Sequence, residues 1–293
     1  MGGLSDHTKL INIIISLASK NVPKDWNNAL WRLGYYVASI EPRFPIDGVG
    51  NSNPDIVLYS EKYKHIVIID CKSKTLKEKQ TMKYLKLKNN PKILINYGVV
   101  EAPINNDLSG DVSFASFHDI SNNPQVRDNP IVILHVIKNE NIIEIIDRKG
   151  NFEINDLNLI FPIQINSKPL YHLYPFDIDD TELFKCHIVH KLIKYAYSNK
   201  EFTLDELLRD ILPTWDLIHD TEKRRGFKNR ARDILKDLQN KGLETYLKSK
   251  KLSKSETRWY IDVKDSPQSM QAFIKKCKEI IEIKQETLDS YFK

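Results

Sequence analysis

Cysteine and long apolar runs are scarce in this sequence. Its 293 residues include only 3 cysteines, Cys71, Cys186 and Cys277, which lie too far apart for a disulfide framework or a zinc site. No stretch approaches the ~18 consecutive apolar residues of a membrane span, and the N-terminus lacks the basic and apolar segments of a signal peptide. These absences predict a soluble, cytoplasmic protein without a membrane segment or a structural metal.

Charge is unevenly distributed along the chain. The formal net charge is +5. Between residues 221 and 260, thirteen lysines and arginines stand against five acidic residues, so this block carries +8 and the rest of the chain carries −3. A basic block is often only a solvated helix face, but it can also be the electrostatic footprint of nucleic-acid binding.

Hydrophobic periodicity predicts an α/β fold for the N-terminal half. Hydrophobic residues make up 41% of the sequence, and a length near 300 residues favours about two domains. We expect helices over residues 7–18, 24–40 and 75–88, strands over 42–46, 55–59, 65–70 and 92–98, and a polar, turn-rich segment over 105–128. Two more strands over 131–137 and 142–146 and an apolar run over 157–165 then follow.

The C-terminal half has the pattern of three helices and a two-stranded ribbon, which matches a winged helix. We expect helices over 182–198, 203–212, 221–240 and 268–291, and strands over 243–247 and 259–263. Thr203 and Glu206 form a capping box at the start of one helix. The predicted domains are a core (1–104), a β-rich extension (105–165), a linker (166–180), a winged-helix-like domain (181–265) and a C-terminal helix (266–293).

The sharpest chemical pattern joins two predicted strands. Pro54-Asp55 is followed, after fourteen residues, by Asp70-Cys71-Lys72. Carboxylates at the ends of neighbouring strands can bind one divalent cation, and Mg²⁺ prefers oxygen ligands and retains waters for reaction. Lys72 lies on the same strand face as Asp70, where it can orient or deprotonate water or neutralise a phosphate. We therefore predict Asp55 and Asp70 as metal ligands and Lys72 as a catalytic residue.

Asp-x-Lys alone is a weak signal, because it recurs at Asp147-Arg148-Lys149 and Asp262-Val263-Lys264. Only Asp70 has a Pro-Asp pair at a hairpin's distance before it and an amphipathic helix after it. Taken singly, Asp55 can also be a turn residue, and Asp70 with Lys72 a surface pair. The order in which these residues occur, on the expected elements, favours the site.

The helix after Lys72 carries a second pattern. Gln80 and Tyr84 lie at i and i+4, on one helical face. Together these residues resemble the PD-(D/E)xK nuclease superfamily, and the helix resembles the QxxxY motif of its RecB-type branch, over roughly residues 20–100. The resemblance implies a restriction-endonuclease-like mixed sheet flanked by helices. It also implies Mg²⁺ bound by Asp55 and Asp70, with Mn²⁺ able to substitute, water assisted by Lys72, and Gln80 and Tyr84 near the active site or DNA.

Members of this superfamily often add an acidic residue from the preceding helix. Asp25, near the predicted start of that helix, is the first candidate, and Glu41, just past its end, is the second. Asp25 can equally be a helix N-terminal charge that the helix dipole stabilises. Glu41, before Pro42, can equally be a solvated turn residue, so both alternatives stay open.

The basic block falls on the third helix and the ribbon of the predicted winged helix. That helix would lie in the DNA major groove, and the ribbon would contact phosphates. The predicted DNA-binding residues are Arg224, Arg225, Lys228, Arg230, Arg232, Lys248, Lys250 and Lys251. Winged helices also dock proteins, which remains an alternative.

Together the patterns predict a Mg²⁺-dependent DNA endonuclease that acts in restriction or phage defence. One alternative is the nuclease subunit of a heteromeric transposase, and another is a non-catalytic DNA-binding regulator with a vestigial nuclease core. Hydrolysis of both DNA strands requires two active sites. We therefore expect DNA as a partner, together with a homodimer or a partner subunit, and no membrane.

Overall fold

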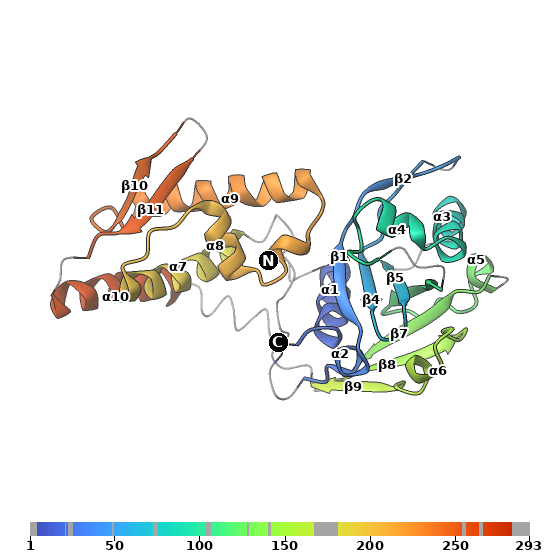
Figure 1. Ribbon diagram of the computed structural model, residues 1–293. Coiled ribbons are helices and arrows are strands. Elements are labelled where there is room, and N and C mark those ends of the chain that lie inside the picture. Colours follow the sequence, from blue (N-terminus) through green and yellow to red (C-terminus); the bar gives the residue numbers. More distant parts are fainter. Residues whose placement is uncertain are drawn as a thin grey trace. The chain divides into compact units, whose positions relative to one another are not determined.

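The chain forms two compact units (Figure 1). The computed structural model describes residues 5–20, 22, 26–48, 50–72, 76–103, 107–127, 129–139, 142–166, 181–253, 256–263 and 266–282. Residues 5–166, together with Leu217–Asp220, belong to the N-terminal unit, and residues 181–216 and 221–282 to the C-terminal unit. The predicted linker lies outside the described residues, except for its first residue.

Seven described strands of the N-terminal unit form one mixed sheet in the order β1-β4-β5-β6-β7-β8-β9. β5, β6 and β7 pair in parallel, and the other neighbours pair antiparallel. These strands are β1 (Tyr36–Ile40), β4 (Ile56–Ser60), β5 (His65–Lys72), β6 (Ser109–Ser116), β7 (Val132–Lys138), β8 (Ile142–Lys149) and β9 (Ile163–Asn166). β2 (Phe44–Ile46) and β3 (Gly50–Ser52) form a separate hairpin.

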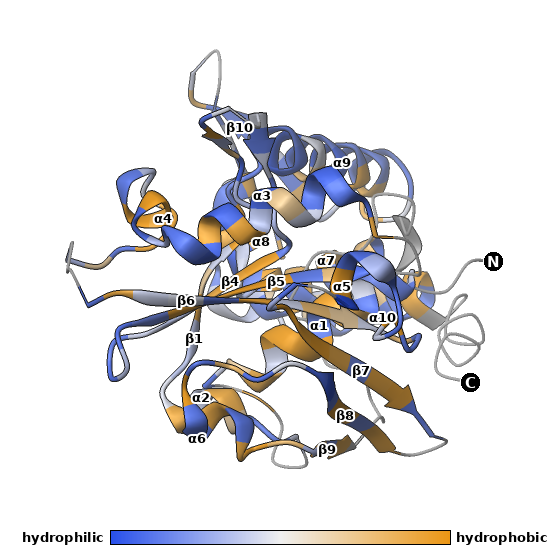
Figure 2. Cartoon of the chain, turned by 90° about the vertical axis from the view of Figure 1, so that its right-hand side faces the viewer, coloured by the Kyte–Doolittle hydropathy of each residue, from blue (hydrophilic) through white to orange (hydrophobic). Residues whose placement is uncertain are grey.

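Helices cover both faces of this sheet, which curls so that β7–β9 turn away from β4–β6 (Figure 2). The unit is therefore mixed α/β, as the sequence predicts. α1 (Asp6–Leu17) packs against β5 from one side, and α3 (Glu78–Asn89) and α4 (Lys92–Asn96) cover the other. The short helices are α2 (Ala29–Leu33), α5 (Pro124–Arg127) and α6 (Asn155–Asn158).

Side-chain alternation along β5 decides which face holds chemistry. Ile66 and Ile68 belong to the hydrophobic core beneath α3, together with Tyr84 and Leu87 of that helix. Successive strand residues point to opposite faces, so Asp70 continues the α3 side of the strand. The apolar core thus positions the end of β5 under α3.

The predicted helix over residues 24–40 is confirmed only over Ala29–Leu33, because residues 26–28 are not helical and residues 36–40 form a strand. α2 ends at Leu33, and the Gly34 that follows has a left-handed φ of 104°, which costs glycine little. Tyr36–Ile40 instead forms β1, which pairs antiparallel with β4. The apolar spacing fits a helix as well as a strand, and pairing with β4 decides between them.

Two further predictions for the N-terminal unit are wrong. Residues 92–96 form α4 and not a strand, because Pro91 begins a short helix whose Leu94 is fully buried. The segment predicted as turn-rich contains β6, which lies in the interior of the sheet between β5 and β7. Its buried polar residues, Asp111, Ser113 and Ser116, conceal the strand from a hydrophobicity pattern.

The C-terminal unit contains four α-helices and a hairpin among its described residues. They are α7 (Thr181–Ser198), α8 (Leu204–Ile211), α9 (Thr221–Asn240), β10 (Leu247–Lys251), β11 (Thr257–Ile261) and α10 (Pro267–Glu282). The predicted helices are confirmed over the residues that the structure describes, including the capping box of Thr203 and Glu206. The first predicted ribbon strand is misplaced, because residues 243–246 form a turn and β10 begins at Leu247.

α10 packs against α7 within the same unit. Residues 283–291 of the predicted last helix lie outside the described residues. Among the helices that the structure describes, none has the length and apolarity needed to cross a bilayer.

Candidate metal centre

Asp55, Asp70 and Lys72 meet at one end of the β4–β5 pair. In this antiparallel pair Ile56 lies opposite Ile69, so the residues that flank them, Asp55 and Asp70, are neighbours on the same face. The Nζ of Lys72 forms an ion pair with Oδ2 of Asp70. Both carboxylates are buried, with exposures of 7% for Asp55 and 2% for Asp70. The structure therefore brings the three predicted residues together.

The two carboxylates affect each other electrostatically. Oδ2 of Asp55 accepts a hydrogen bond of 2.6 Å from the backbone N–H of Cys71. Burial raises the pKa of the Asp55 carboxyl well above its ordinary value, and the negative charge of Asp70 raises it further. A buried pair of acidic groups of this kind is costly without a cation, and a bound metal ion offsets that cost.

Cys71, between Asp70 and Lys72, has no catalytic geometry. It is buried on the α1 side of β5, and burial raises the pKa of its thiol well above the usual value. A thiol that stays protonated is a poor nucleophile and a poor metal ligand. Cys71 therefore fills the core, as the sequence predicts.

α3 contributes Gln80 and Tyr84 to the same site. Nε2 of Gln80 donates hydrogen bonds to Oδ2 of Asp70 at 3.2 Å and to the Tyr84 hydroxyl at 3.0 Å. The Tyr84 hydroxyl donates in turn to the carbonyl oxygen of Asn53 at 3.3 Å. Burial, followed by the charge of Asp70, raises the pKa of Tyr84 well above its ordinary value, so the phenol keeps its proton. Gln80 thus holds Asp70 in place, and Tyr84 holds Gln80.

Two further potential ligands lie beside Asp55. His7 stands in the first turn of α1, and Glu41 directly follows β1 and donates its backbone N–H to the carbonyl oxygen of Asp55 at 2.9 Å. One ligand atom from each of His7, Glu41 and Asp55 lies within 4.8 Å of the others. The structure thus gathers one imidazole and two carboxylates at the point where the sequence predicts a metal.

The orientation of His7 suits a cation. Its Nδ1 lies 3.3 Å from the carbonyl oxygen of Cys71, which can only accept, so Nδ1 carries a hydrogen. The Nε2 of a neutral ring then presents a lone pair toward Oδ1 of Asp55, 3.5 Å away. The lone pairs of His7 Nε2 and Asp55 Oδ1 repel each other, and either a cation between the two atoms or a second proton on the ring removes this repulsion. Metal-binding histidines are commonly oriented by such a backbone hydrogen bond.

Glu41 is the second acidic candidate predicted from the sequence, whereas His7 is not among the predicted site residues. Asp25, the first candidate, lies outside the described residues. No local spacing joins His7 to Asp55, because the packing of α1 against β5 brings them together. The one feature of the sequence that could have pointed to His7 is that it is a potential ligand in the first turn of the first helix.

The predicted DNA-binding residues fall into two groups. Arg224 lies over the Trp215 ring at 4.8 Å and Lys228 pairs with Asp205 at 2.8 Å, so both have partners within their own unit. Lys248 donates to the carbonyl oxygen of Glu244, Arg232 donates to Asn229, and Arg230 is partly buried. The exposed members are Arg225, Lys250 and Lys251.

Comparison with known proteins gives a family for the N-terminal unit. A family model described as the MJECL32 domain matches residues 6–174. The chain belongs to this family. A second model, described as "Domain of unknown function (DUF8601)", matches residues 177–291. The two matches meet within the segment that the sequence predicts as a linker.

A curated relative of this MJECL32-domain chain is the "Uncharacterized protein MJECL32" of Methanocaldococcus jannaschii. It is 36% identical over 215 residues, which cover 67% of this chain and 48% of the relative. The chain thus spans about half the length of that relative. No solved structure matches the chain.

Proposed function

We propose that this protein is a metal-dependent DNA endonuclease of the PD-(D/E)xK type. The observation that carries the proposal is the convergence of Asp55, Asp70 and Lys72 at one end of β4–β5, with Gln80 of α3 bonded to Asp70. A curled mixed sheet with helices on both faces is compatible with a restriction-endonuclease-like core and supports the proposal.

In the proposed reaction a water attacks the scissile phosphorus, and the bond from phosphorus to the leaving oxygen breaks. A bound divalent ion supplies Lewis acidity, which lowers the pKa of water and neutralises charge on the phosphate. Asp55 and Asp70 are the proposed ligands, with His7 and Glu41 as additional ones. Lys72 stabilises the negative charge that develops on the phosphate and orients the water.

The donor set bears on the choice of ion. Mg²⁺ and Mn²⁺ both bind carboxylate oxygens, but an imidazole nitrogen favours the softer Mn²⁺. If His7 is a ligand, Mn²⁺ supports cleavage at least as well as Mg²⁺. Removing the His7 ring then lowers cleavage in the presence of Mn²⁺ more than cleavage in the presence of Mg²⁺.

We propose the C-terminal unit as a winged-helix-like DNA-binding domain. Three helices followed by the β10–β11 hairpin support this assignment, as does the excess of eight positive charges between residues 221 and 260. α9 would enter the major groove, and the hairpin would contact phosphates. The alternative, a protein-docking module, predicts no salt-dependent affinity for DNA.

Restriction or phage defence is the proposed setting, and a nuclease subunit of a heteromeric transposase would use the same chemistry. Cutting both strands requires two such sites, so we propose a homodimer or a partner subunit. A non-catalytic DNA-binding regulator remains the competing function. Only this last alternative predicts DNA binding without hydrolysis.

Plasmid cleavage by the full-length protein tests the proposal. We expect Mg²⁺- or Mn²⁺-dependent nicking or linearisation that Asp70→Ala and Lys72→Ala abolish. Asp147→Ala is the matched control, because Asp147 is exposed, begins another Asp-x-Lys sequence and lies outside the site. Equal cleavage by all variants would exclude the assigned site. DNA binding with no cleavage under either ion would favour the regulator.

A further inference from the structure

A cavity of about 280 Å³ opens beside the candidate metal centre. Gln80 and Tyr84 form one part of its wall, and Lys77, Lys79 and Lys83 line the rest of its α3 side. The described residues that line it include no carboxylate. Since Gln80 also bonds to Asp70, this positively charged cavity adjoins the metal centre directly.

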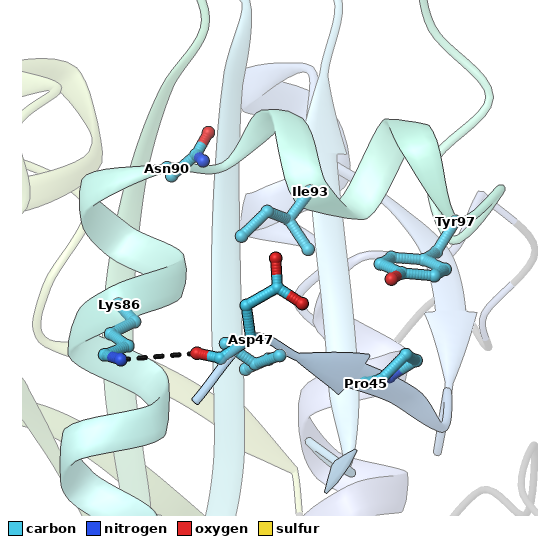
Figure 3. Close-up of a pocket in the computed structure, with 7 residues that line it drawn as sticks. Pro45, Asp47, Lys86, Asn90, Ile93 and Tyr97 are labelled. Carbon is cyan, nitrogen blue, oxygen red and sulfur yellow. Dashed lines mark hydrogen bonds between the residues drawn. The ribbon is translucent and has the colours of Figure 1, made fainter. Parts of the chain in front are cut away.

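A second cavity, of about 290 Å³, lies further along α3 (Figure 3). Its character is different, because Tyr97 and Ile93 of the α4 region supply apolar surface, and Asp47 and Asn90 supply polar atoms. Figure 3 shows the Asp47 carboxylate directed into this space beside the Tyr97 ring. Nζ of Lys86 donates to the backbone carbonyl of Asp47 at 3.4 Å.

The two cavities share the same two walls, α3 and the β2–β3 hairpin. Lys79, Lys83, Lys86 and Asn90 are spaced by four, three and four residues, which puts them along one face of α3. Nζ of Lys83 donates to the carbonyl oxygen of Asn51 and ties the hairpin to the helix. At a rise of ~1.5 Å per residue, this face extends ~16 Å.

We propose that these cavities bind an unpaired DNA strand that runs from the metal centre along α3. Its phosphates contact Lys77, Lys79 and Lys83, and a base stacks on Tyr97. The inference rests on the proposed function and adds a substrate preference: DNA with a single-stranded segment next to the scissile bond is bound more tightly than a fully paired duplex.

Tyr97 is the reason for choosing an unpaired strand over a duplex. Its side chain is 49% exposed, with one side packed on Phe44 at a centroid distance of 5.9 Å. In a duplex the faces of the bases are already stacked on each other, so only an unpaired base can stack on an exposed ring. Lysines followed by an exposed aromatic ring are typical of single-strand binding. The Asp47 carboxylate repels phosphate but accepts hydrogen bonds from the amino groups of bases.

Binding of the full-length protein to two DNAs in EDTA tests this inference without cleavage. One is a blunt duplex, and the other is the same duplex with an unpaired tail of about eight nucleotides, within the ~4–16-nucleotide range of single-strand-binding modules. We expect the tail to tighten binding about tenfold or more, which corresponds to ~1.4 kcal/mol. A 2-aminopurine base in the tail should lose fluorescence when it stacks on Tyr97.

Substitutions assign these effects to the cavities. Tyr97→Ala should abolish the fluorescence change and most of the gain in affinity that the tail gives, whereas Tyr97→Phe should retain both effects. Lys79→Glu should remove the gain, because Lys79 is exposed and its reversal leaves the fold intact. Lys138→Glu is the matched control, since Lys138 is also exposed but ends β7 and lines neither cavity.

Equal affinity for the two DNAs, or a fluorescence change that survives Tyr97→Ala, would overturn the inference. The result is separable from that of the proposed function. Binding of the tail as expected without any cleavage of DNA would support the strand-binding surface and contradict the nuclease assignment. Cleavage of DNA with equal affinity for the tailed and the blunt duplex would support the nuclease assignment and contradict the strand-binding surface.

Discussion

Asp55 shows how a functional residue can cost stability. Its carboxylate is buried beside Asp70, and its pKa is raised well above the ordinary value by burial and by that neighbouring charge. A raised carboxyl pKa means that the folded state disfavours the ionised form, so Asp55 lowers the free energy of unfolding at neutral pH when no metal is bound.

Asp55→Asn should therefore stabilise the metal-free protein. The side-chain oxygen of the amide can still accept from the N–H of Cys71, while the buried negative charge is gone. In EDTA at pH 7 we expect a higher melting temperature, by about 2–4 °C for each kcal/mol gained. Added Mn²⁺ should raise the free energy of unfolding of the wild type only, by ~2.7 kcal/mol at 100 times Kd, and its melting temperature should rise with it. Asp147→Asn, at an exposed carboxylate, is the control, and a loss of stability in Asp55→Asn would contradict the argument.

A second buried carboxylate, Asp111, has the opposite role. Nε2 of His65 donates to it at 3.1 Å, Nζ of Lys88 at 2.7 Å and the backbone N–H of Glu153 at 2.6 Å. The Tyr35 hydroxyl donates to Nδ1 of His65 at 2.8 Å. Burial alone would raise the pKa of Asp111, but these hydrogen bonds outweigh burial and hold the pKa below its ordinary value. Asp111 lines neither of the two cavities along α3, and its role is to join β5, β6 and α3.

Asp111→Asn should destabilise the protein in a pH-dependent way. A depressed carboxyl pKa stabilises the fold above the unfolded value of ~3.9, and this contribution is lost as the pH falls through the folded value. We expect a loss of ~3–5 kcal/mol, constant between pH 7 and about pH 5 and smaller below about pH 4. Urea unfolding at several pH values measures the difference. A loss that grows in acid would refute this account.

At the scale of elements, strands with continuous apolar runs are predictable from the sequence, whereas β6 is not. β4 and β5 each contain a run of four buried apolar residues, and the hairpin between them fixes the neighbourhood of Asp55 and Asp70. β6 reaches its interior position through parallel pairing with β5 and β7 and buries Asp111 there. That polar residue is stabilised by partners distant in sequence, which no local pattern shows.

The same distinction applies to the candidate site. Gln80 and Tyr84 are predictable because their helical spacing puts them on one face of the helix. Lys72 is predictable because side chains alternate between the two faces of a strand, which puts it on the same face as Asp70. His7 joins them only when α1 packs on the far side of β5, so its place depends on tertiary contacts.

The β10–β11 hairpin has two unlike faces. Lys250 lies opposite Arg258, on the same face as Lys248, and Lys251 lies on the other face, which also carries the buried Trp259. We expect Lys250→Gln to lower the slope of log affinity for DNA against log salt by ~0.9, the value for one phosphate contact. Lys251→Gln should change it less. Gel-shift titrations from low to high salt measure both, and a salt-independent loss at Lys250 would contradict phosphate binding.

At the scale of the whole molecule, the candidate chemistry and the excess positive charge belong to different units. The N-terminal unit holds Asp55, Asp70 and Lys72, while residues 221–260 of the C-terminal unit carry the +8 block. Substitutions in the two units should therefore change different kinetic constants. Residues without shared partners have additive effects on free energy.

Lys72→Ala should lower the single-turnover rate at saturating DNA, by about 10²–10³-fold for one group that stabilises developing charge, and leave Kd nearly unchanged. Arg225→Glu, at an exposed position of α9, should raise Kd and leave that rate unchanged. The kcat/KM of the double variant should fall by the product of the factors for the two single variants. A slower single-turnover rate in Arg225→Glu at saturating DNA would mean that α9 acts on the chemical step, and the division of roles between the units would then be wrong.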